Sequence, residues 1–419
     1  MSKSDSNSTS LSNEEILKKI ANKEMPIYQI ENFTDPDSAV KIRRSVIEQH
    51  SKVKLEHIGT TAFDYARIMG RNAENVIGTV SIPLGVAGPL KINGEFAKDE
   101  FYVPMATTEG ALIASVSRGA KAANKSGGVT VRIIEDGMTR GPVFSFDSII
   151  DVQRFLKWLP ENYEKIRGAA EETTDHGKLK SIKPLVNGND VFLRFRYSTG
   201  DAMGMNMVTV ATEAACTYIE KNFKGARLIA VSGNVCSDKK QSHMNSIEGR
   251  GKTAIAEATI KESVLNEVFN ATAEAVNEVN YVKNWIGSAR AGSAIQFNSH
   301  FANIVAAVFL ATGQDPAQVV ESSSGYTTTK VRGKDLYITV TLPSLEVGTI
   351  GGGTGLATQR ESLTILGAAG PGSADGENSK KLAEIIAATV LCGELNLLSA
   401  LAGRELGKAH QKLGRNKVD

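Results

Sequence analysis

Apolar residues recur at helical spacing in two short segments near the start of the chain. These segments, residues 13–23 and 37–50, predict two amphipathic helices. The stretch before them is polar, serine-rich and without an apolar run, so residues 1–12 are expected to form a disordered tail and not a signal segment. The pattern predicts a small helical N-terminal domain, residues 13–77.

A third helical pattern follows a stretch of glycine, proline and short apolar runs that begins near residue 76. Residues 107–123 repeat apolar side chains at helical spacing, and Gly127-Gly128 ends the repeat. The spacing predicts a helix with Glu109 in its first turn.

The middle of the chain changes to the alternating periodicity of strands. Four segments alternate apolar and polar residues, and two helical patterns separate them. The strand-like segments are residues 129–137, 142–146, 191–198 and 227–233, and the helical ones are 149–171 and 203–223. This order predicts a ferredoxin-like domain, residues 142–230, inserted into a larger domain made of residues 78–141 and 231–419.

Helical patterns dominate the rest of the chain. One runs from residue 252 to about 285, an alanine-rich one covers 299–311, and a long amphipathic one covers 380–413. Between the last two lie a strand pair, KVRGKDLYITVTL, and the loop GTIGGGTGL. The whole pattern predicts an α+β fold whose large, mixed domain contains a long central helix.

Composition narrows the classes of function. The chain has 419 residues, 41% hydrophobic and 22% charged, with a net charge of +2, which is typical of a multidomain globular protein. It has no basic stripe with interleaved aromatic residues, so nucleic acid is not an expected partner. The three cysteines, Cys216, Cys236 and Cys392, form no CxxC pair, which predicts a reducing compartment and neither disulfides nor a zinc–thiolate site.

Membrane association is not expected either. The most apolar short run, residues 304–311, is far below the roughly 20 residues that a spanning helix needs. These features together predict a soluble, cytoplasmic protein.

Two glycine-rich segments resemble nucleotide-binding motifs without satisfying them. GRGKT, residues 249–253, lacks the first glycine of a phosphate-binding P-loop because Ser246 occupies that position. GGGTG, residues 351–355, is followed by Leu356 where G-x-G-x-x-G needs its third glycine. The sequence therefore does not support a Rossmann fold, and the second segment is expected to form a flexible or close-approach loop.

Several residues have both a chemical and a structural explanation when each is taken alone. Asp201, in DAMGMN, precedes a helix whose N-terminus suits a phosphate, but Asp201 also suits a helix N-cap. Asp315 before Pro316 has the pattern of a helix start, and Glu109 would complement a helix dipole. His410 lies in the last turn of the predicted terminal helix, where an imidazolium is favoured, and a solvated surface histidine is the alternative.

The adjacent charges Asp238-Lys239-Lys240 are of a kind usually exposed to solvent, but their setting indicates more. The run SGNVCSDKK occurs in one order with ENVIGTVSIPLGVAGPL, ATTEGALIAS, EDGMTRGPV, GDAMGMNMV, GQDPAQ, GTIGGGTG and GKAH. From about residue 39 to 410 the chain resembles the 3-hydroxy-3-methylglutaryl-CoA (HMG-CoA) reductases. Within that family it looks most like the soluble archaeal-type members of the biosynthetic class.

The resemblance implies roles for individual residues. The implied catalytic residues are Glu109, Lys239, Asp315 and His410. The implied substrate positions are Arg140, Ser232, Asp238, Lys240 and Asn298 for the HMG moiety, and Ser115, Ser117 and Arg118 for CoA. The implied cofactor positions are Asp201, Met203, Gly204, Met205, Asn206, Gly351, Gly352 and Gly353. The family further implies NADPH as co-substrate of the small domain, no metal, and a homodimer or dimer of dimers with shared active sites.

The implied reaction explains why these residue types are needed. A thioester is reduced by two hydrides, through a hemithioacetal and an aldehyde, to mevalonate and free CoA, a committed step of isoprenoid synthesis. Lys239 would stabilise the oxyanion, and Glu109 would deliver its proton from a carboxyl whose pKa is raised by burial or by Asp315. His410 would protonate the departing CoA thiolate. The arginine and lysine among the substrate positions suit the free carboxylate of HMG.

Two alternatives stay open. A degradative member of the family would oxidise mevalonate with NAD, whereas the detailed segments match the biosynthetic class and so favour NADPH. Lys178 and Lys180 are candidates for binding the 2′-phosphate of that cofactor. A non-enzymatic CoA- or nucleotide-binding protein would be expected to lack the catalytic residue types, and all four are present. Asn416 occupies the position of a regulatory serine in animal and fungal relatives, so phosphorylation control there is not expected.

Overall fold

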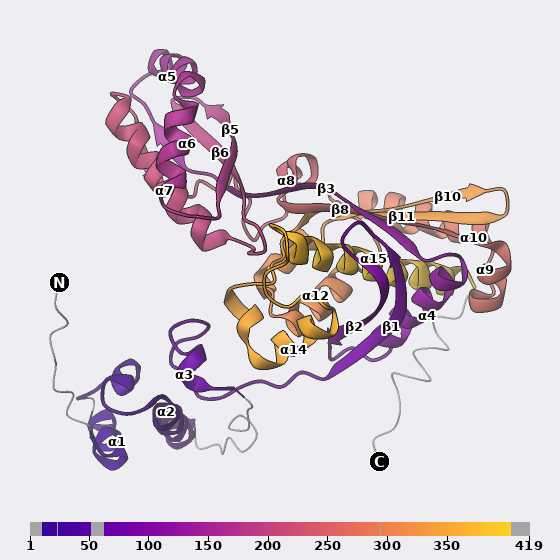
Figure 1. The fold of residues 1–419 in the computed structure, drawn as a ribbon, viewed down its shortest axis with the longest axis horizontal. Helices are drawn as coiled ribbons and strands as arrows, with labels where there is room; N and C mark the ends of the chain where they lie inside the picture. Colours follow the sequence, from indigo (N-terminus) through magenta and orange to yellow (C-terminus); the bar gives the residue numbers. More distant parts are fainter. Residues whose placement is uncertain (1–10, 23, 52–62, 294, 404–419) are drawn as a thin grey trace. The chain divides into compact units, whose positions relative to one another are not determined.

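The computed structural model describes residues 11–22, 24–51, 63–293 and 295–403 and is drawn in Figure 1. Contacts divide the chain into two compact units, Met1–Pro83 with Gly355–Gln359, and Leu84–Thr354 with Arg360–Asp419. Most of the predicted N-terminal tail, and the predicted terminal helix beyond residue 403, fall outside the described residues.

The first unit is helical, as the sequence predicts. Its elements are α1 (Asn13–Ala21), η1 (Ile27–Asn32), α2 (Pro36–Ser51) and α3 (Tyr65–Ile68). A capping box begins α1, because Ser12 and Glu15 each accept the other's backbone N–H. Ile16, Ile30 and Ile42 are buried together in a small core. The two predicted N-terminal helices are confirmed.

A mixed sheet forms the centre of the second unit. The strands of its larger part are β1 (Leu84–Asn93), β2 (Lys98–Ala106), β3 (Val129–Arg140), β8 (Gly251–Ile260), β9 (Gln296–Phe297), β10 (Gly325–Arg332) and β11 (Asp335–Leu345). β3, β8, β11 and β10 are antiparallel neighbours in that order, whereas β1 pairs with β3 and β9 with β10 in parallel. The β10–β11 hairpin confirms the predicted strand pair.

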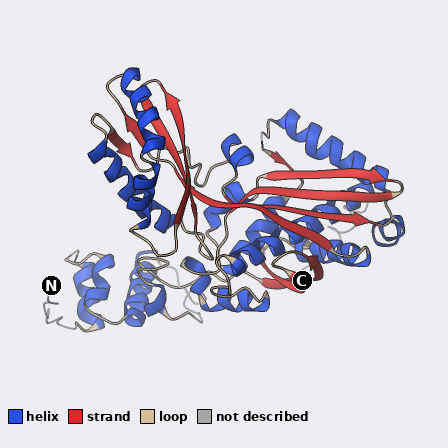
Figure 2. Ribbon diagram, turned by 45° about the horizontal axis from the view of Figure 1, so that its top comes forward, coloured by secondary structure: helices blue, strands red, loops and turns tan. Residues whose placement is uncertain are grey.

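The strand β3 continues from this larger part into a smaller set of strands, as Figure 2 shows. The smaller set is β4 (Val143–Ser145), β5 (Lys178–Asn187), β6 (Asp190–Ser198) and β7 (Arg227–Ala230), with the helices α5 (Ile149–Glu161), α6 (Tyr163–Glu171) and α7 (Met205–Asn222). The order is β7-β4-β6-β5, and every neighbouring pair is antiparallel. Phe144, Phe155 and Phe195 lie in a core separate from that of the larger part.

One long helix, α15, runs through the core of the larger part. The remaining elements are α4 (Leu112–Lys125), α8 (His243–Glu248), α9 (Glu262–Phe269), α10 (Ala273–Val279), η2 (Asn280–Gly287), α11 (Ser288–Ala291), α12 (Phe301–Thr312), η3 (Pro316–Gln318), α13 (Val319–Ser322), η4 (Gly352–Gly355), α14 (Ala357–Ile365) and α15 (Glu377–Ala402). α4 crosses α15 closely at Gly119, where a Cβ would lie 1.9 Å from the carbonyl oxygen of Cys392. By length and apolarity α15 could cross a membrane, but 83% of its apolar window is buried inside the protein, which identifies it as a core helix. Within the part of the chain that the structure describes, α15, and not residues 304–311, is the most membrane-like segment.

Two predicted helices have different limits in the structure. The helix predicted over residues 107–123 begins only at Leu112, because Gly110 and a left-handed Ala111, with φ of 73°, precede it. Glu109 therefore lies in a turn and not in the first turn of a helix. The pattern over residues 149–171 forms two helices, which separate at Asn162.

The prediction of one helix from residue 252 to about 285 is wrong. Its first part is the strand β8, which pairs with both β3 and β11, and α9, α10 and η2 follow it. The segment TAIAEATI is rich in alanine, a strong helix former, but pairing on both edges overrides that local preference. The strand β5 is a second difference, because its charged and largely exposed residues give little alternation of apolar and polar positions.

Candidate active site

Lys239 lies in a tight loop between β7 and α8. Lys239 has φ of 58°, and two further non-glycine residues of the loop are also left-handed. The N–H of Gly233 donates to the carbonyl of Gly141 at 2.6 Å, and the hydroxyl of Thr139 donates to the carbonyl of Cys236 at 3.1 Å. These bonds hold the loop against the end of β3.

The side chain of Lys239 meets Asp315. The Nζ of Lys239 lies 2.9 Å from Oδ2 of Asp315, and the two side chains are 44% and 31% exposed, so a ligand can reach them. Asp315 also caps η3, since its Oδ1 accepts the N–H of Ala317 at 3.0 Å. The hydrogen bond to Asp315, with the charges of Asp238 and Glu321, raises the pKa of Lys239 above its ordinary value of 10.5, against the effect of partial burial. Asp315 is therefore both the cap of η3 and the partner of Lys239. Lys239 is an ammonium at neutral pH.

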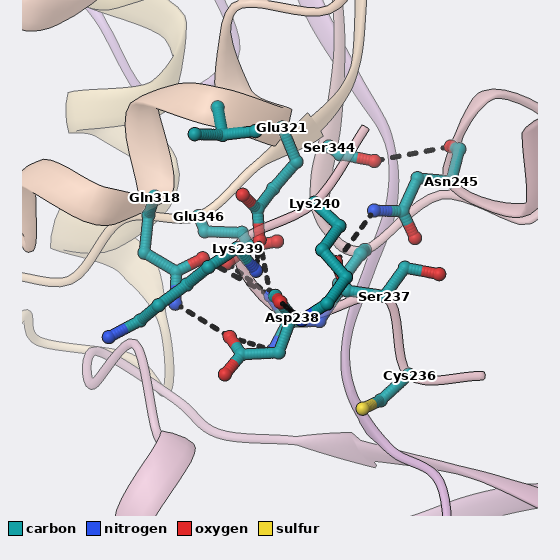
Figure 3. A network of polar contacts seen from close by, with 12 residues as sticks. Cys236, Ser237, Asp238, Lys239, Lys240, Asn245, Gln318, Glu321, Ser344 and Glu346 are labelled. Carbon is teal, nitrogen blue, oxygen red and sulfur yellow. Dashed lines mark hydrogen bonds and ion pairs between the residues drawn. The ribbon is translucent and has the colours of Figure 1, made fainter. Parts of the chain in front are cut away.

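The residues on either side of Lys239, Asp238 and Lys240, make different contacts, as Figure 3 shows. The Oδ1 of Asp238 accepts a hydrogen bond from Gln318 at 3.0 Å and lies 3.1 Å from Nη2 of Arg250. Lys240 is exposed, and its Nζ donates to the backbone carbonyl of Asp238 at 3.0 Å. The triplet therefore has one inward carboxylate, one ammonium paired with Asp315, and one surface ammonium.

Three predicted substrate residues lie in segments that adjoin this loop. Arg140 ends β3, and its buried Nε has no hydrogen-bond partner among the residues that the structure describes. The Oγ of Ser232 lies 3.6 Å from Sγ of Cys236. The amide of Asn298 donates to two backbone carbonyls of residues 323–325. An unpaired buried guanidinium N–H is a donor available to an anion, and Arg140 offers one.

The three predicted CoA residues lie on α4. Ser115 accepts a hydrogen bond from Nδ2 of Asn396 at 2.7 Å, and Ser117 accepts one from the backbone of β1 at 3.2 Å. Arg118 donates twice to the carbonyl of Val268, at 3.1 and 2.5 Å. All three side chains tie α4 to neighbouring elements, so any contact with CoA would come in addition to this structural role.

The two predicted cofactor segments lie side by side. Ala202 and Ile350 form a parallel bridge that joins DAMGMN to the glycine-rich loop. The buried carboxylate of Asp201 accepts the N–H groups of Gly372 and Ser379, both at 2.8 Å. Asp201 therefore anchors the start of α15, a role that its sequence pattern does not reveal.

The remaining cofactor positions surround this junction. Asn206 is exposed in the first turn of α7, which follows the left-handed Gly204 with φ of 92°. A Cβ added at Gly351 or Gly352 would meet nothing within 4 Å, whereas one at Gly353 would lie 2.6 Å from the carbonyl oxygen of Gly313. Met203 and Met205 pack against the core of the smaller strand set. The junction thus combines an open glycine backbone with the N-terminus of an 18-residue helix.

Glu109 does not join the Lys239–Asp315 pair within this chain. Its side chain is exposed, and its N–H donates to the hydroxyl of Thr107 at 3.0 Å. Among the described residues, the carboxylate of Glu109 makes no hydrogen bond or ion pair with either member of the pair. His410 falls outside the described residues. The structure therefore brings together two of the four predicted catalytic residues.

Three buried charged residues behind the loop were not among the predicted site residues. Arg250 lies 3.0 Å from Oε1 of Glu321 through its Nη1, which also contacts Glu346, and all three side chains are fully buried. The sequence does contain one indication of this buried cluster, because Arg250 stands between two glycines in GRGK. A Cβ at Gly251 would lie 2.7 Å from the carbonyl oxygen of Leu345, so that position requires glycine.

Solved structures share this fold. A class II HMG-CoA reductase of Streptococcus pneumoniae, bound to NADPH in open conformations, aligns with a TM-score of 0.64 at 18% identity, covering 93% of this chain and 97% of that one. A second structure of the Streptococcus pneumoniae enzyme gives a TM-score of 0.63, again at 18% identity, covering 93% of this chain and 85% of that one. Both establish a mixed α+β fold.

Sequence comparison gives the family. A model of the hydroxymethylglutaryl-coenzyme A reductases matches residues 39–415. The reductase of Aeropyrum pernix is 52% identical over 404 residues, which cover 96% of both chains. The reductase of Pyrococcus horikoshii is 51% identical over 406 residues, covering 96% of this chain and 98% of its own. The chain belongs to the HMG-CoA reductase family, whose members reduce HMG-CoA to mevalonate in the mevalonate pathway.

Proposed function

We propose that this chain reduces (S)-HMG-CoA to (R)-mevalonate and free CoA with two hydrides from NADPH, as a biosynthetic, archaeal-type enzyme. The identity of about half the residues with archaeal reductases, across nearly the full length of both chains, supports the reaction and the class. NADPH supplies the hydrides, and the chain's own residues position the substrate and manage charge.

The Lys239–Asp315 pair is the observation that carries this proposal. The two residues are 76 positions apart in the sequence, and their side chains meet at 2.9 Å where both remain accessible. A protonated ammonium in a fixed position stabilises the oxyanion that forms when each carbonyl is reduced. Asp315 keeps the ammonium charged and limits its motion. Lys239 therefore serves both reduction steps.

Glu109 and His410 complete the proposed chemistry. Glu109 delivers the proton to the reduced oxygen, and His410 protonates the departing CoA thiolate. A homodimer or dimer of dimers that shares active sites between subunits accounts for the separation of Glu109 from the Lys239–Asp315 pair in one chain. Both assignments rest on the family pattern around these residues.

The substrate's two ends have separate proposed sites. The free carboxylate of HMG is bound by Arg140, whose buried and unpaired Nε supports this role, and by Lys240. Ser232, Asp238 and Asn298 hold the rest of the HMG moiety. The CoA portion lies along α4, where Ser115, Ser117 and Arg118 are exposed in part.

The smaller strand set is proposed to be an inserted, ferredoxin-like NADPH domain, residues 142–230, and not a Rossmann fold. The antiparallel order β7-β4-β6-β5, with helices connecting β4 to β5 and β6 to β7, supports the ferredoxin-like assignment. The open glycine backbone at Gly351 and Gly352 and the N-terminus of α7 fit the phosphates of a dinucleotide. Residues 13–77 are proposed as the helical domain, and residues 78–141 and 231–419 as the HMG-CoA-binding domain.

The protein is proposed to work in the cytoplasm. Its three cysteines are buried and unpaired, which supports a reducing compartment. The burial of α15 inside the protein supports a chain that functions without a membrane.

A spectrophotometric assay tests the reaction and the cofactor together. The purified chain is mixed with HMG-CoA and either NADPH or NADH, and absorbance loss and mevalonate are measured. We expect two NADPH consumed per mevalonate and a much slower rate with NADH. A strong preference for NADH would contradict the biosynthetic assignment, and no turnover with either cofactor would contradict the reaction.

Two substitutions test the assigned roles. Lys239→Ala is expected to lower kcat for HMG-CoA by roughly 1000-fold while the far-ultraviolet circular dichroism is unchanged. His410→Gln is expected to slow HMG-CoA reduction and to leave the reduction of free mevaldehyde intact, because mevaldehyde has no thiolate to release. Equal loss on both substrates for His410→Gln would refute the thiolate assignment.

A further inference from the structure

A buried cluster of charges lies directly behind the Lys239 loop. The guanidinium of Arg250 is fully buried and contacts the carboxylates of Asp238, Glu321 and Glu346. It also donates to Thr139 at 3.2 Å. Burying an arginine and several carboxylates costs free energy that apolar packing would not cost, so such a cluster calls for a reason beyond stability.

Glu321 connects this cluster to the backbone of Lys239. The N–H of Lys239 donates to Oε1 of Glu321 at 2.6 Å, and the same oxygen lies 3.0 Å from Nη1 of Arg250. In Figure 3 Glu321 and Glu346 lie beside the loop, and the side chain of Lys239 extends past Gln318. One carboxylate oxygen thus links the buried guanidinium to the residue whose ammonium meets Asp315.

The conformation of Lys239 explains why such a link matters. With φ of 58°, Lys239 is in the left-handed region, which costs free energy for any residue that has a Cβ. The backbone conformation sets the direction of the Cα–Cβ bond and hence of the side chain. The hydrogen bond from the Lys239 N–H to the buried Oε1 of Glu321 stabilises this conformation over the relaxed one, which would turn the ammonium away from Asp315.

We propose that Glu321, held in place by Arg250, is a positioning residue that fixes the backbone of Lys239 and thereby aims its ammonium at Asp315 and the reacting oxygen. This inference rests on the proposed role of Lys239. Glu321 does not touch substrate in this account and acts only through Lys239. The essential atom is the acceptor oxygen and not the negative charge.

Two variants of Glu321 separate these contributions. Glu321→Ala removes the acceptor, and we expect kcat for HMG-CoA to fall by about 100-fold, since small displacements of a catalytic group have effects of that size, with the KM for NADPH unchanged. Glu321→Gln keeps a carbonyl oxygen for the Lys239 N–H, and its kcat should stay within about threefold of the wild type. Equal loss in the two variants would overturn the acceptor role.

Glu384 provides a matched control. It is fully buried in α15, and its carboxylate accepts the N–H groups of Glu95, Phe96 and Ala97 in the β1–β2 turn. Glu384→Ala therefore also removes a buried carboxylate that holds a backbone segment, but it leaves the Lys239 loop intact. We expect it to lower thermal stability at least as much as Glu321→Ala does, with kcat per folded molecule unchanged.

The pH profile of kcat distinguishes positioning from a general loss of structure. The carboxylates of Asp315, Asp238 and Glu321 all favour the ammonium of Lys239, Asp315 most strongly. If Glu321→Ala turns Lys239 away from Asp315, the alkaline limb of kcat moves to lower pH. Glu384→Ala lowers the amount of folded enzyme without moving this limb. An unmoved limb in Glu321→Ala would contradict the proposal.

The outcomes also separate this inference from the proposed function. If Lys239→Ala keeps its activity, the role of Lys239 fails, whatever Glu321→Ala does. If Lys239→Ala is inactive and folded Glu321→Ala turns over at the wild-type rate, only the positioning role fails. Should Glu321→Ala not fold, Glu321→Met fills a similar volume without an acceptor oxygen, and the same kcat and pH measurements decide.

Discussion

Two regions of the molecule bury or half-bury carboxylates, and they neutralise them by different means. Around Lys239, the carboxylates of Asp315 and Glu321 each pair with a lysine or an arginine and also accept one backbone N–H. In the core helix α15, Glu384 accepts three backbone N–H groups, and Glu394 accepts those of residues 299 and 300. The first region adds cationic side chains as partners, whereas the second relies on backbone N–H groups, with the hydroxyl of Thr327 as a further donor to Glu394.

The difference separates chemistry from architecture. A carboxylate bound mainly by backbone N–H groups holds one segment of the chain to another. A carboxylate paired with an ammonium or guanidinium sets the charge and direction of that cation, which a reaction can use. The loop that carries Lys239 is therefore the region where substitutions should alter turnover, and α15 the region where they should alter stability.

Of the three substitutions Asp315→Asn, Glu384→Ala and Glu346→Gln, the first, in the region around Lys239, should have the largest effect. The pKa of Lys239 is raised above 10.5 mainly by its hydrogen bond to Asp315, so a neutral partner lowers it. Lys239 then loses its proton at a lower pH as the pH rises, and the alkaline limb of kcat moves down. Near neutral pH Lys239 is still an ammonium, but its side chain is no longer held by the ion pair, so we expect kcat to fall by about 100-fold. Initial rates from pH 6 to 10 check this, and an unmoved limb would argue against the pair.

Glu384→Ala should have an intermediate effect, on stability alone. Three backbone N–H groups in the β1–β2 turn lose their buried acceptor, which should lower the free energy of unfolding by about 3 kcal/mol. Urea denaturation followed by circular dichroism measures the loss. A large fall in kcat per folded molecule would contradict the assignment of α15 to stability alone.

The smallest effect is expected for Glu346→Gln. Burial raises the pKa of Glu346 well above 4.5. The charge of Arg250 lowers this pKa in part, and the neighbouring Glu321 raises it further. A carboxyl with a raised pKa holds more protons in the folded state, so the wild type loses stability as the pH rises from about 4.5 through the folded pKa. Glutamine has no such proton, so the free energy of unfolding of the variant should rise relative to that of the wild type over that range. Urea midpoints from pH 4.5 to 8 test this, and parallel curves would contradict it.

Local patterns predicted much of the fold. The N-terminal helices, the strands around residues 129–137 and 191–198, and the β10–β11 hairpin follow from periodicity because each has one clearly apolar face. Strand β8 does not, since its alanines suit a helix and only pairing with β3 and β11 decides between the two. The edge strand β5 has too little buried surface to produce a pattern.

The residues of the site divide in the same way, into those that local motifs predict and those that only distant contacts bring together. Motifs in family order predicted Lys239 and Asp315, and the structure joins them. No local pattern could connect Glu321 with Lys239 or with Arg250, because those contacts span 82 and 71 residues. Asp201 is a further case, since its hydrogen bonds to the start of α15 span 171 and 178 residues.

The reduction of free mevaldehyde by Lys239→Ala tests whether Lys239 acts in both reduction steps. Mevaldehyde skips the first hydride transfer and the release of CoA, so only the second oxyanion remains to be stabilised. If the Lys239 ammonium faces the reacting oxygen in both steps, kcat for mevaldehyde should fall by roughly the same 1000-fold as kcat for HMG-CoA. Reduction of mevaldehyde at the wild-type rate by the folded variant would contradict the account.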